Sequence, residues 1–225
     1  MTGLRAVLFD IDGTLVDSNY LHVDAWHRAF QTLGVDVEAW RIHRSIGQDP
    51  GQMIDSLVGN RDQHWVTEAK RLHTENYLSL APRLRTFAHA RDLLRTLAEQ
   101  GHLVVLVTTA PEDELSILLE VLDSEAAIHA TTNGDDVDVA KPDPDIVRVA
   151  LERAGVGPEE AVFVGDSVWD MMAASRVGVQ PFGMLSGGNA GQLLIEAGAG
   201  AIFENPADLL ARLAVLGLRD PSGTP

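Results

Sequence analysis

Residues 4–15 read Leu4-Arg5-Ala6-Val7-Leu8-Phe9-Asp10-Ile11-Asp12-Gly13-Thr14-Leu15. The apolar run from Ala6 to Phe9 predicts a short buried strand. Asp10 and Asp12 follow the run at once, and Gly13 then allows the backbone to turn sharply. Carboxylates at the carboxyl end of a buried strand lie where open α/β sheets bind their ligands, although an ordinary Asp-Gly turn would give the same local pattern.

The composition narrows the class of protein. The chain has 225 residues, 45% of them hydrophobic, which is enough for one or two domains with a sizeable core. No apolar run reaches the roughly 18 residues of a membrane helix and no signal peptide is recognised, so no membrane partner is expected. The net charge of −16 argues against nucleic acid as a partner, and the absence of cysteine suits a cytoplasmic protein.

The segment after Leu15 has a helical pattern. Apolar residues recur at helical spacing from Leu21 to Leu33, and a polar helical texture continues to about Leu80, broken by several glycines. We therefore expect residues 17–82 to form a small helical cap inserted into a core made of residues 1–16 and 83–225. Three tryptophans of the insertion, Trp26, Trp40 and Trp65, are expected to lie in its hydrophobic core.

The rest of the chain alternates between apolar runs and amphipathic segments. Strands are predicted at residues 102–107, 127–130, 161–164, 179–185 and 201–203, with helices of about ten residues between them. This alternation is typical of a doubly wound α/β fold with a parallel sheet. The glycine-rich stretch 186–191 lacks the spacing and the lysine of a phosphate-binding loop, so we interpret it as a flexible turn.

Polar residues follow several of these predicted strands and would meet at one edge of a parallel sheet. Clustered carboxylates repel one another unless a cation lies among them, and oxygen ligands favour Mg²⁺ over zinc. Lysine is otherwise rare in this chain, and a hydroxyl and a lysine beside the metal would suit a phosphoryl group. The residues concerned are Asp10, Asp12, Thr108, Lys141, Asp166 and Asp170.

These residues stand in four ordered motifs. They are Asp10-Ile11-Asp12-Gly13-Thr14-Leu15, Thr108, Lys141-Pro142-Asp143-Pro144-Asp145 and Gly165-Asp166-Ser167-Val168-Trp169-Asp170. Together they resemble the motifs of the haloacid dehalogenase superfamily, whose members share a Rossmann-like core and, in one branch, a helical cap between the first two motifs. The resemblance covers residues 4 to about 213 and implies the same fold here.

The resemblance also implies a role for each residue. Asp10 would attack phosphorus and become an aspartyl phosphate, and Asp12 would act as the acid and base. Thr108, Thr109 and Lys141 would bind the phosphorylated substrate, with His22 of the cap as a further substrate-binding candidate. Asp10, Asp12 through its carbonyl, and Asp166 would hold Mg²⁺, with Asp170 supporting the metal through a water.

The expected function is that of a phosphoric monoester hydrolase acting on a small phosphorylated metabolite of the sugar phosphate or phosphoglycolate type, as a monomer or homodimer. The placement of His22 resembles the cap-hinge histidine of β-phosphoglucomutase-like members, which leaves a mutase as an alternative. The cap arginine of the mutases is absent after Gly47, and Arg41 or Arg44 is the candidate to replace it. Two further alternatives are a phospho-accepting module similar to receiver domains and an inactive binding protein on the same fold.

Overall fold

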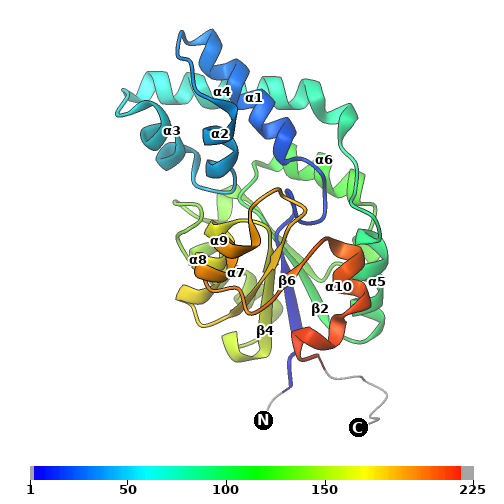
Figure 1. Cartoon of the computed structure of the whole chain (residues 1–225). Helices are drawn as coiled ribbons and strands as arrows, with labels where there is room; N and C mark the ends of the chain where they lie inside the picture. The colour runs from blue at the N-terminus through cyan, green and yellow to red at the C-terminus, as the bar shows by residue number, and fades with distance from the viewer. Residues whose placement is uncertain (1–2, 219–225) are drawn as a thin grey trace. The chain divides into compact units, whose positions relative to one another are not determined.

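The structure is a computed structural model that describes residues 3–218. The chain divides into two compact units (Figure 1). One unit, here called the core, comprises the residues up to Asp17 and from Arg85 onward, and the other, the helical unit, comprises Ser18–Leu84. The sequence places these boundaries one and two residues earlier, after residues 16 and 82.

A six-stranded parallel sheet forms the centre of the core. Its order is β3-β2-β1-β4-β5-β6, so the first strand in the sequence is central and has neighbours on both sides. The strands are continuous apolar runs because helices cover both faces of the sheet. Their bounds are β1 Ala6–Phe9, β2 Leu103–Val107, β3 Ala130–Thr132, β4 Ala161–Gly165, β5 Gln180–Met184 and β6 Ile202–Phe203.

Helices cover the two faces of this sheet (Figure 1). On one face α7 and α8 pack against Leu8, Val105 and Phe163 with small and branched apolar side chains. On the opposite face α5 packs on β2 and contacts α10. The helices of the core are α5 Ala90–Glu99, α6 Glu112–Leu122, α7 Asp145–Ala154, α8 Val168–Arg176, α9 Gly191–Glu196 and α10 Pro206–Ala211.

The helical unit contains α1 Asn19–Thr32, α2 Ala39–Ser45, α3 Pro50–Val58 and α4 Gln63–Leu80. Trp26 and Phe30 are buried in its core, and Trp65 packs against them half-buried. The expectation for Trp40 is wrong, because this side chain is 60% exposed. The short helix α2 buries only Ile42 and Ser45, so Trp40 lies on its outer side.

One predicted strand is shifted along the chain. Residues 127–130 were expected to be extended, but Glu125–Ala127 form a 3₁₀ turn and the strand runs from Ala130 to Thr132. Thr131 and Thr132 suit a strand because they are β-branched, whereas Ala127 at the start of the predicted segment has little strand preference and lies in the 3₁₀ turn. The sequence also predicts a disordered tail at Asp220–Pro225, and these residues lie outside those that the structure describes.

The chain leaves and re-enters the core at one place. Val16 and Thr86 form an antiparallel bridge, and the N–H of Asp17 donates to the carbonyl of Arg85 at 2.8 Å. The two connecting segments are therefore tied to each other by the backbone of the core. Among the described residues, no helix has the length and apolar character that crossing a membrane requires.

Candidate active site

The carboxyl ends of three adjacent strands bring the predicted residues together. Phe9 at the end of β1 pairs with Leu106 of β2 on one side and with Val164 of β4 on the other. The residues that follow these strand ends, Asp10 and Asp166 among them, therefore emerge at the same edge of the sheet. This edge is where a parallel α/β sheet presents its ligand site.

Three carboxylates lie close together at this edge. Asp10, Asp166 and Asp170 each have a carboxylate oxygen within 4.8 Å of one from the others, and all three side chains are buried. Thr14 donates a hydrogen bond from its hydroxyl to Asp166 at 3.2 Å. A buried set of oxygen donors of this kind fits a hard divalent cation such as Mg²⁺.

Lys141 is the counter-charge within the cluster. Its side chain is buried, and its Nζ lies 2.5 Å from Asp10 and 2.7 Å from Asp170. The same Nζ also donates to the carbonyl of Val107 at 3.2 Å. Lys141 is thus held by three oxygen atoms, beside the carboxylate that the sequence predicts as the nucleophile.

Burial and the attraction between Asp10 and Lys141 shift the pKa of each of these residues in opposite directions. Burial raises the pKa of Asp10 well above its ordinary value of 3.8; Lys141 opposes that rise, and the neighbouring carboxylates add to it. Burial alone would lower the pKa of Lys141, but Asp10 and Asp170 outweigh it and raise that pKa, so the side chain is an ammonium ion at neutral pH. Because several carboxylates face one ammonium group, a bound cation would stabilise the ionised cluster.

Asp170 is held in place by the start of α8. Its Oδ2 accepts hydrogen bonds from the N–H of Ser167 at 3.1 Å and from the Ser167 hydroxyl at 2.7 Å, while Oδ1 faces Lys141. The backbone of Gly165 lies so close that a Cβ there would come within 2.6 Å of Oδ2. Both oxygens of Asp170 therefore already face protein donors, which suits a residue that positions Lys141.

The turn after β1 carries Asp12. Gly13 has a φ of +74°, in the left-handed region, and its N–H donates to the carbonyl of Val16 at 2.8 Å. Asp12 is half-buried in this turn, and its side chain is not one of the three carboxylates grouped within 4.8 Å. The cluster that could hold a cation is therefore formed by the other three carboxylates.

Thr108 is fixed by a threonine of the neighbouring strand. The hydroxyl of Thr132 accepts from the N–H of Thr108 at 3.1 Å and donates to its carbonyl at 3.0 Å, and Thr132 is fully buried. The hydroxyl of Thr108 accepts from the N–H of Ala110 at 3.0 Å. Thr109 is half-buried, and its carbonyl lies against Gly134, where a Cβ would approach it to 2.9 Å.

His22 belongs to the helical unit and has partners there. Its ring stacks on Tyr77 with the ring centroids 3.9 Å apart, and its Nδ1 lies 3.1 Å from Nε2 of His73. The two candidate arginines are also engaged within this unit. Arg41 pairs with Glu38 at 3.4 Å, and Arg44 lies over the ring of Trp40.

A loop that the sequence did not assign to the site also contacts it. Ser186 donates from its hydroxyl to the carbonyl of Gly13 at 2.7 Å, and Asn189 donates from its side chain to the carbonyl of Asp166 at 3.1 Å. The interpretation of this stretch as a flexible turn missed these bonds. The available signal was its position, since it follows β5 as Asp10 follows β1.

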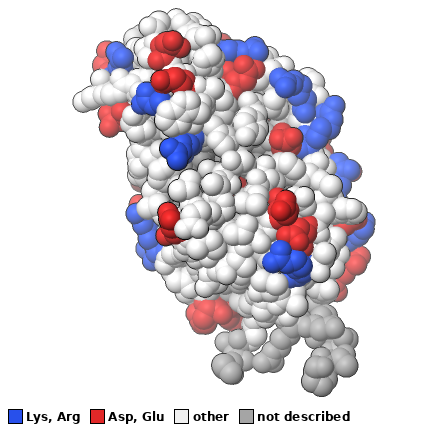
Figure 2. Space-filling model, viewed as in Figure 1, with Lys and Arg blue, Asp and Glu red and all other residues white. Residues whose placement is uncertain are grey.

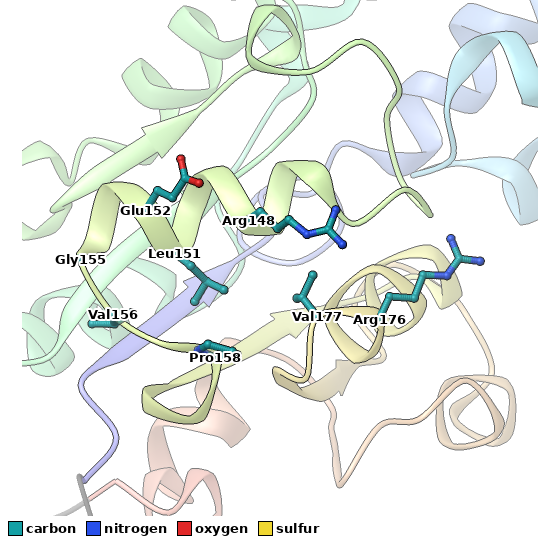
Figure 3. Close-up of a pocket in the computed structure, with 8 residues that line it drawn as sticks. All are labelled: Arg148, Leu151, Glu152, Gly155, Val156, Pro158, Arg176 and Val177. Atoms are coloured by element: carbon teal, nitrogen blue, oxygen red, sulfur yellow. The ribbon is translucent and has the colours of Figure 1, made fainter.

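The pocket drawn in Figure 3 is a separate feature of the core. It has a volume of ≈ 590 Å³ and is lined by residues near the carboxyl ends of α7 and α8, and none of the predicted site residues lines it. The side chains of Arg148 and Arg176 both extend to the right in Figure 3, away from Gly155 and Val156. Arg176 donates to the carbonyl of Pro142 at 2.5 Å and so helps to fix the segment after Lys141.

Charge on the visible surface is mixed. Figure 2 shows acidic and basic side chains interspersed on the face drawn there, without a broad basic patch. An extended basic surface is the usual footprint of nucleic-acid binding. The charge distribution on this face therefore does not favour nucleic acid as a ligand.

Comparison with known proteins covers most of the chain. Residues 7–184 match the family described as haloacid dehalogenase-like hydrolase. A phosphoglycolate phosphatase from Shigella boydii is 30% identical over 240 residues, covering 94% of this chain and 93% of that protein. A phosphorylated carbohydrates phosphatase from Thermotoga maritima is 30% identical over 210 residues, covering 92% of this chain and 97% of that protein.

A solved structure also matches closely. The crystal structure of a hydrolase from Pseudomonas syringae superposes with a TM-score of 0.89 at 34% identity, covering 93% of this chain and 98% of that one. The matched family segment contains all four motifs, three of which supply the cluster described above.

Proposed function

This chain belongs to the haloacid dehalogenase-like hydrolases, and from that membership we propose that it is a Mg²⁺-dependent phosphatase of a small phosphorylated metabolite. The family and the two phosphatase relatives support the class of phosphoric monoester hydrolase. The observation that carries the mechanism is the buried carboxylate of Asp10, which lies 2.5 Å from the ammonium of Lys141 and belongs to the same carboxylate cluster as Asp166.

The first chemical step transfers the phosphoryl group to Asp10. An Asp10 carboxylate oxygen forms a bond to phosphorus while the bond from phosphorus to the leaving oxygen breaks. Asp12 donates its proton to that leaving oxygen, which departs as an alcohol. Lys141 and the Thr108 hydroxyl bind the phosphoryl oxygens and stabilise the charge that develops on them.

The second step restores the enzyme. Asp12, now a carboxylate, accepts a proton from a water molecule as that water attacks phosphorus. The bond between phosphorus and Asp10 breaks, which releases inorganic phosphate and regenerates both side chains in their starting protonation states. One group thus serves as acid and then as base, which requires a carboxylate that is not itself a cation ligand.

Mg²⁺, when bound, would neutralise the repulsion between the Asp10 carboxylate and the phosphate dianion. The carboxylates of Asp10 and Asp166 and the carbonyl of Asp12 are the ligands that we assign to it. Asp170 stays with Lys141 and Ser167, so we assign it a supporting place in the site.

The substrate class is drawn from the relatives. One is named for phosphoglycolate and the other for phosphorylated carbohydrates, and both align over almost the whole of this chain. We therefore propose a phosphorylated sugar or phosphoglycolate as the substrate.

The sheet order bears on the receiver-like alternative. Receiver domains have the order 2-1-3-4-5, whereas this sheet has the order 3-2-1-4-5-6. β1 has β2 as one neighbour in both topologies, but its other neighbour is β3 in receivers and β4 in this sheet. The resemblance to receivers therefore ends at the residue types. A phosphatase is favoured over a phospho-accepting module.

The test is phosphate release from a panel of sugar phosphates, phosphoglycolate and nucleotides, with Mg²⁺ and with EDTA. We expect turnover of at least one small substrate with Mg²⁺ and none with EDTA. Asp10→Asn should abolish release, whereas the matched control Asp113→Asn, an exposed aspartate at the start of α6, should leave it unchanged. A mutase would instead produce an isomer of the sugar phosphate, which chromatography distinguishes from free phosphate.

Asp12→Asn separates the two chemical steps. An aryl phosphate has a leaving group that needs no proton, so this variant should still become phosphorylated but should hydrolyse slowly. Intact-mass spectrometry should then detect one added phosphoryl group. Wild-type turnover by Asp12→Asn, or release by pure Asp10→Asn, would refute the assignment of these roles.

A further inference from the structure

The loop between β5 and α9 contacts Asp166, one of the three clustered carboxylates. This loop, Ser186–Asn189, is called the β5–α9 loop below. We propose that it is a positioning element that holds the Asp166 carboxylate in the orientation needed to bind the cation. The proposal rests on the proposed function, because that function assigns a divalent cation to Asp166.

Gly187 makes the closest approach to the carboxylate. A Cβ placed on Gly187 would lie 1.7 Å from Oδ2 of Asp166 and 2.3 Å from its Cγ. Either the carboxylate or the loop would have to move by at least about 1 Å to relieve that overlap. The absence of a side chain at this position thus allows Asp166 to occupy its place.

The other oxygen of the same carboxylate is also held. Thr14 donates from its hydroxyl to Oδ1 of Asp166 at 3.2 Å, and Asp166 is only 2% exposed. One oxygen of Asp166 therefore faces the Thr14 hydroxyl, and the other faces the Gly187 backbone. Rotation of the Asp166 side chain would break the contact with Thr14, so it costs free energy. A Cβ on Gly187 would therefore displace the carboxylate oxygens that are proposed to bind the cation.

Two side chains anchor the loop to the motifs that it serves. Asn189 bonds the carbonyl of Asp166 at 3.1 Å, and Ser186 bonds the carbonyl of Gly13 at 2.7 Å. The loop also closes on itself, because the N–H of Gly188 donates to the carbonyl of Leu185 at 2.9 Å. It thereby connects the turn after β1 with the residue after β4, which are the two places that supply the proposed ligands.

Such outer contacts influence cation affinity. A ligand whose orientation is fixed before binding loses little conformational freedom when the cation arrives. Substitution of residues that orient ligands typically weakens metal affinity by about 10- to 100-fold. We expect this range for Gly187→Ala.

The test measures Mg²⁺ binding alone, by isothermal titration without substrate. The matched control is Gly191→Ala, at the start of α9, where a Cβ would meet Leu185 at 3.4 Å and Ile202 at 3.7 Å, both ordinary van der Waals contacts. Gly187→Ala should bind Mg²⁺ at least about 10-fold more weakly than wild type, and Gly191→Ala should bind within about twofold of it. Equal affinity in Gly187→Ala and wild type, or equal weakening in both variants, would overturn the proposal.

A second variant covers the case in which Gly187→Ala fails to fold. Asn189→Ala adds no atoms and removes only the bond to the Asp166 carbonyl, and it should also weaken Mg²⁺ binding by about 10-fold. Wild-type affinity in a folded Asn189→Ala would then overturn the role of the loop while leaving the proposed phosphatase intact. Absence of Mg²⁺ binding by the wild-type protein would instead contradict the proposed function, and the loop proposal with it.

Discussion

Replacing Lys141 by methionine should expose how strongly the acidic cluster depends on one ammonium group. Met is close to lysine in volume, so packing is largely kept while the charge and its three contacts are lost. The variant leaves Asp10 and Asp170 buried without their partner and removes the bond to the carbonyl of Val107. Removing one member of a buried ion pair costs about 3–5 kcal/mol of stability, and we expect a loss in this range for the core.

The loss should also depend on pH. Lys141 lowers the pKa of Asp10, which burial raises above 3.8, so in the variant that pKa rises further. The folded state then binds a proton more tightly than the unfolded state, and stability falls as pH rises through and above the unfolded value. The deficit relative to wild type should therefore be smallest near pH 4 to 5 and largest at neutral pH.

The assay is urea unfolding in EDTA, followed by circular dichroism at several pH values. Lys70→Met is the matched control, because Lys70 is the other lysine of the chain and is exposed. In thermal unfolding, a loss of this size would lower the midpoint temperature by roughly 6–20 °C for a chain of this length. Adding Asp170→Asn to Lys141→Met should restore part of the stability, since one unpaired carboxylate disappears. A Lys141→Met variant within about 1 kcal/mol of wild type at neutral pH would refute the reasoning.

Two further substitutions test how the site and the helical unit are held. Thr132→Val removes the hydroxyl that bonds both backbone groups of Thr108, so the core should lose about 2 kcal/mol of stability and KM for the substrate should rise. Thr132→Ser keeps the hydroxyl and should retain both properties. Identical KM values for the Val and Ser variants would contradict the role of this hydroxyl. His73 has a pKa well below 6.5 because of burial and the nearby His22, so the unfolded chain binds a proton that the folded chain does not, and stability should fall as pH drops below about 6.5. His73→Phe keeps an aromatic ring against Trp26 and should make this decline shallower in thermal unfolding between pH 5 and 8; an unchanged slope would mean that other groups cause the decline.

The centre of the site could be predicted because its signals are local. An apolar run that ends in a polar residue is visible in a few consecutive letters, and a parallel sheet brings such ends to one edge. This reasoning located Asp10, Thr108 and Asp166 correctly at neighbouring strand ends. It needed no knowledge of side-chain packing.

The contacts that support the site could not be predicted in the same way. The proximity of Gly187 to Asp166 and the bond from Ser186 to Gly13 join segments far apart in the sequence. A glycine-rich stretch gives no sign of which carboxylate it will meet until the strand order is known. The same rule that found Asp10 would have selected Ser186, had it been applied to the end of β5.

Two wrong predictions, the position of β3 and the burial of Trp40, concern an edge strand and a short helix. The strand β3 lies at one edge of the sheet and is three residues long, so its sequence carries little periodic signal. Trp40 lies in a helix of seven residues, too short for its pattern to show which side faces the core. In both cases tertiary contacts, which the sequence does not display, decide the outcome.

The bridge between Val16 and Thr86 has a consequence for how this architecture can vary. Because the backbone of the core itself ties the two connecting segments together, the sheet does not depend on the length of the chain between them. Enlarging such an insertion adds only a slowly growing closure entropy, about 0.6 kcal/mol for each doubling in length. The segment Ser18–Leu84 could therefore be replaced as a unit. The same core could accept insertions of different size and chemistry while its own strands keep their register.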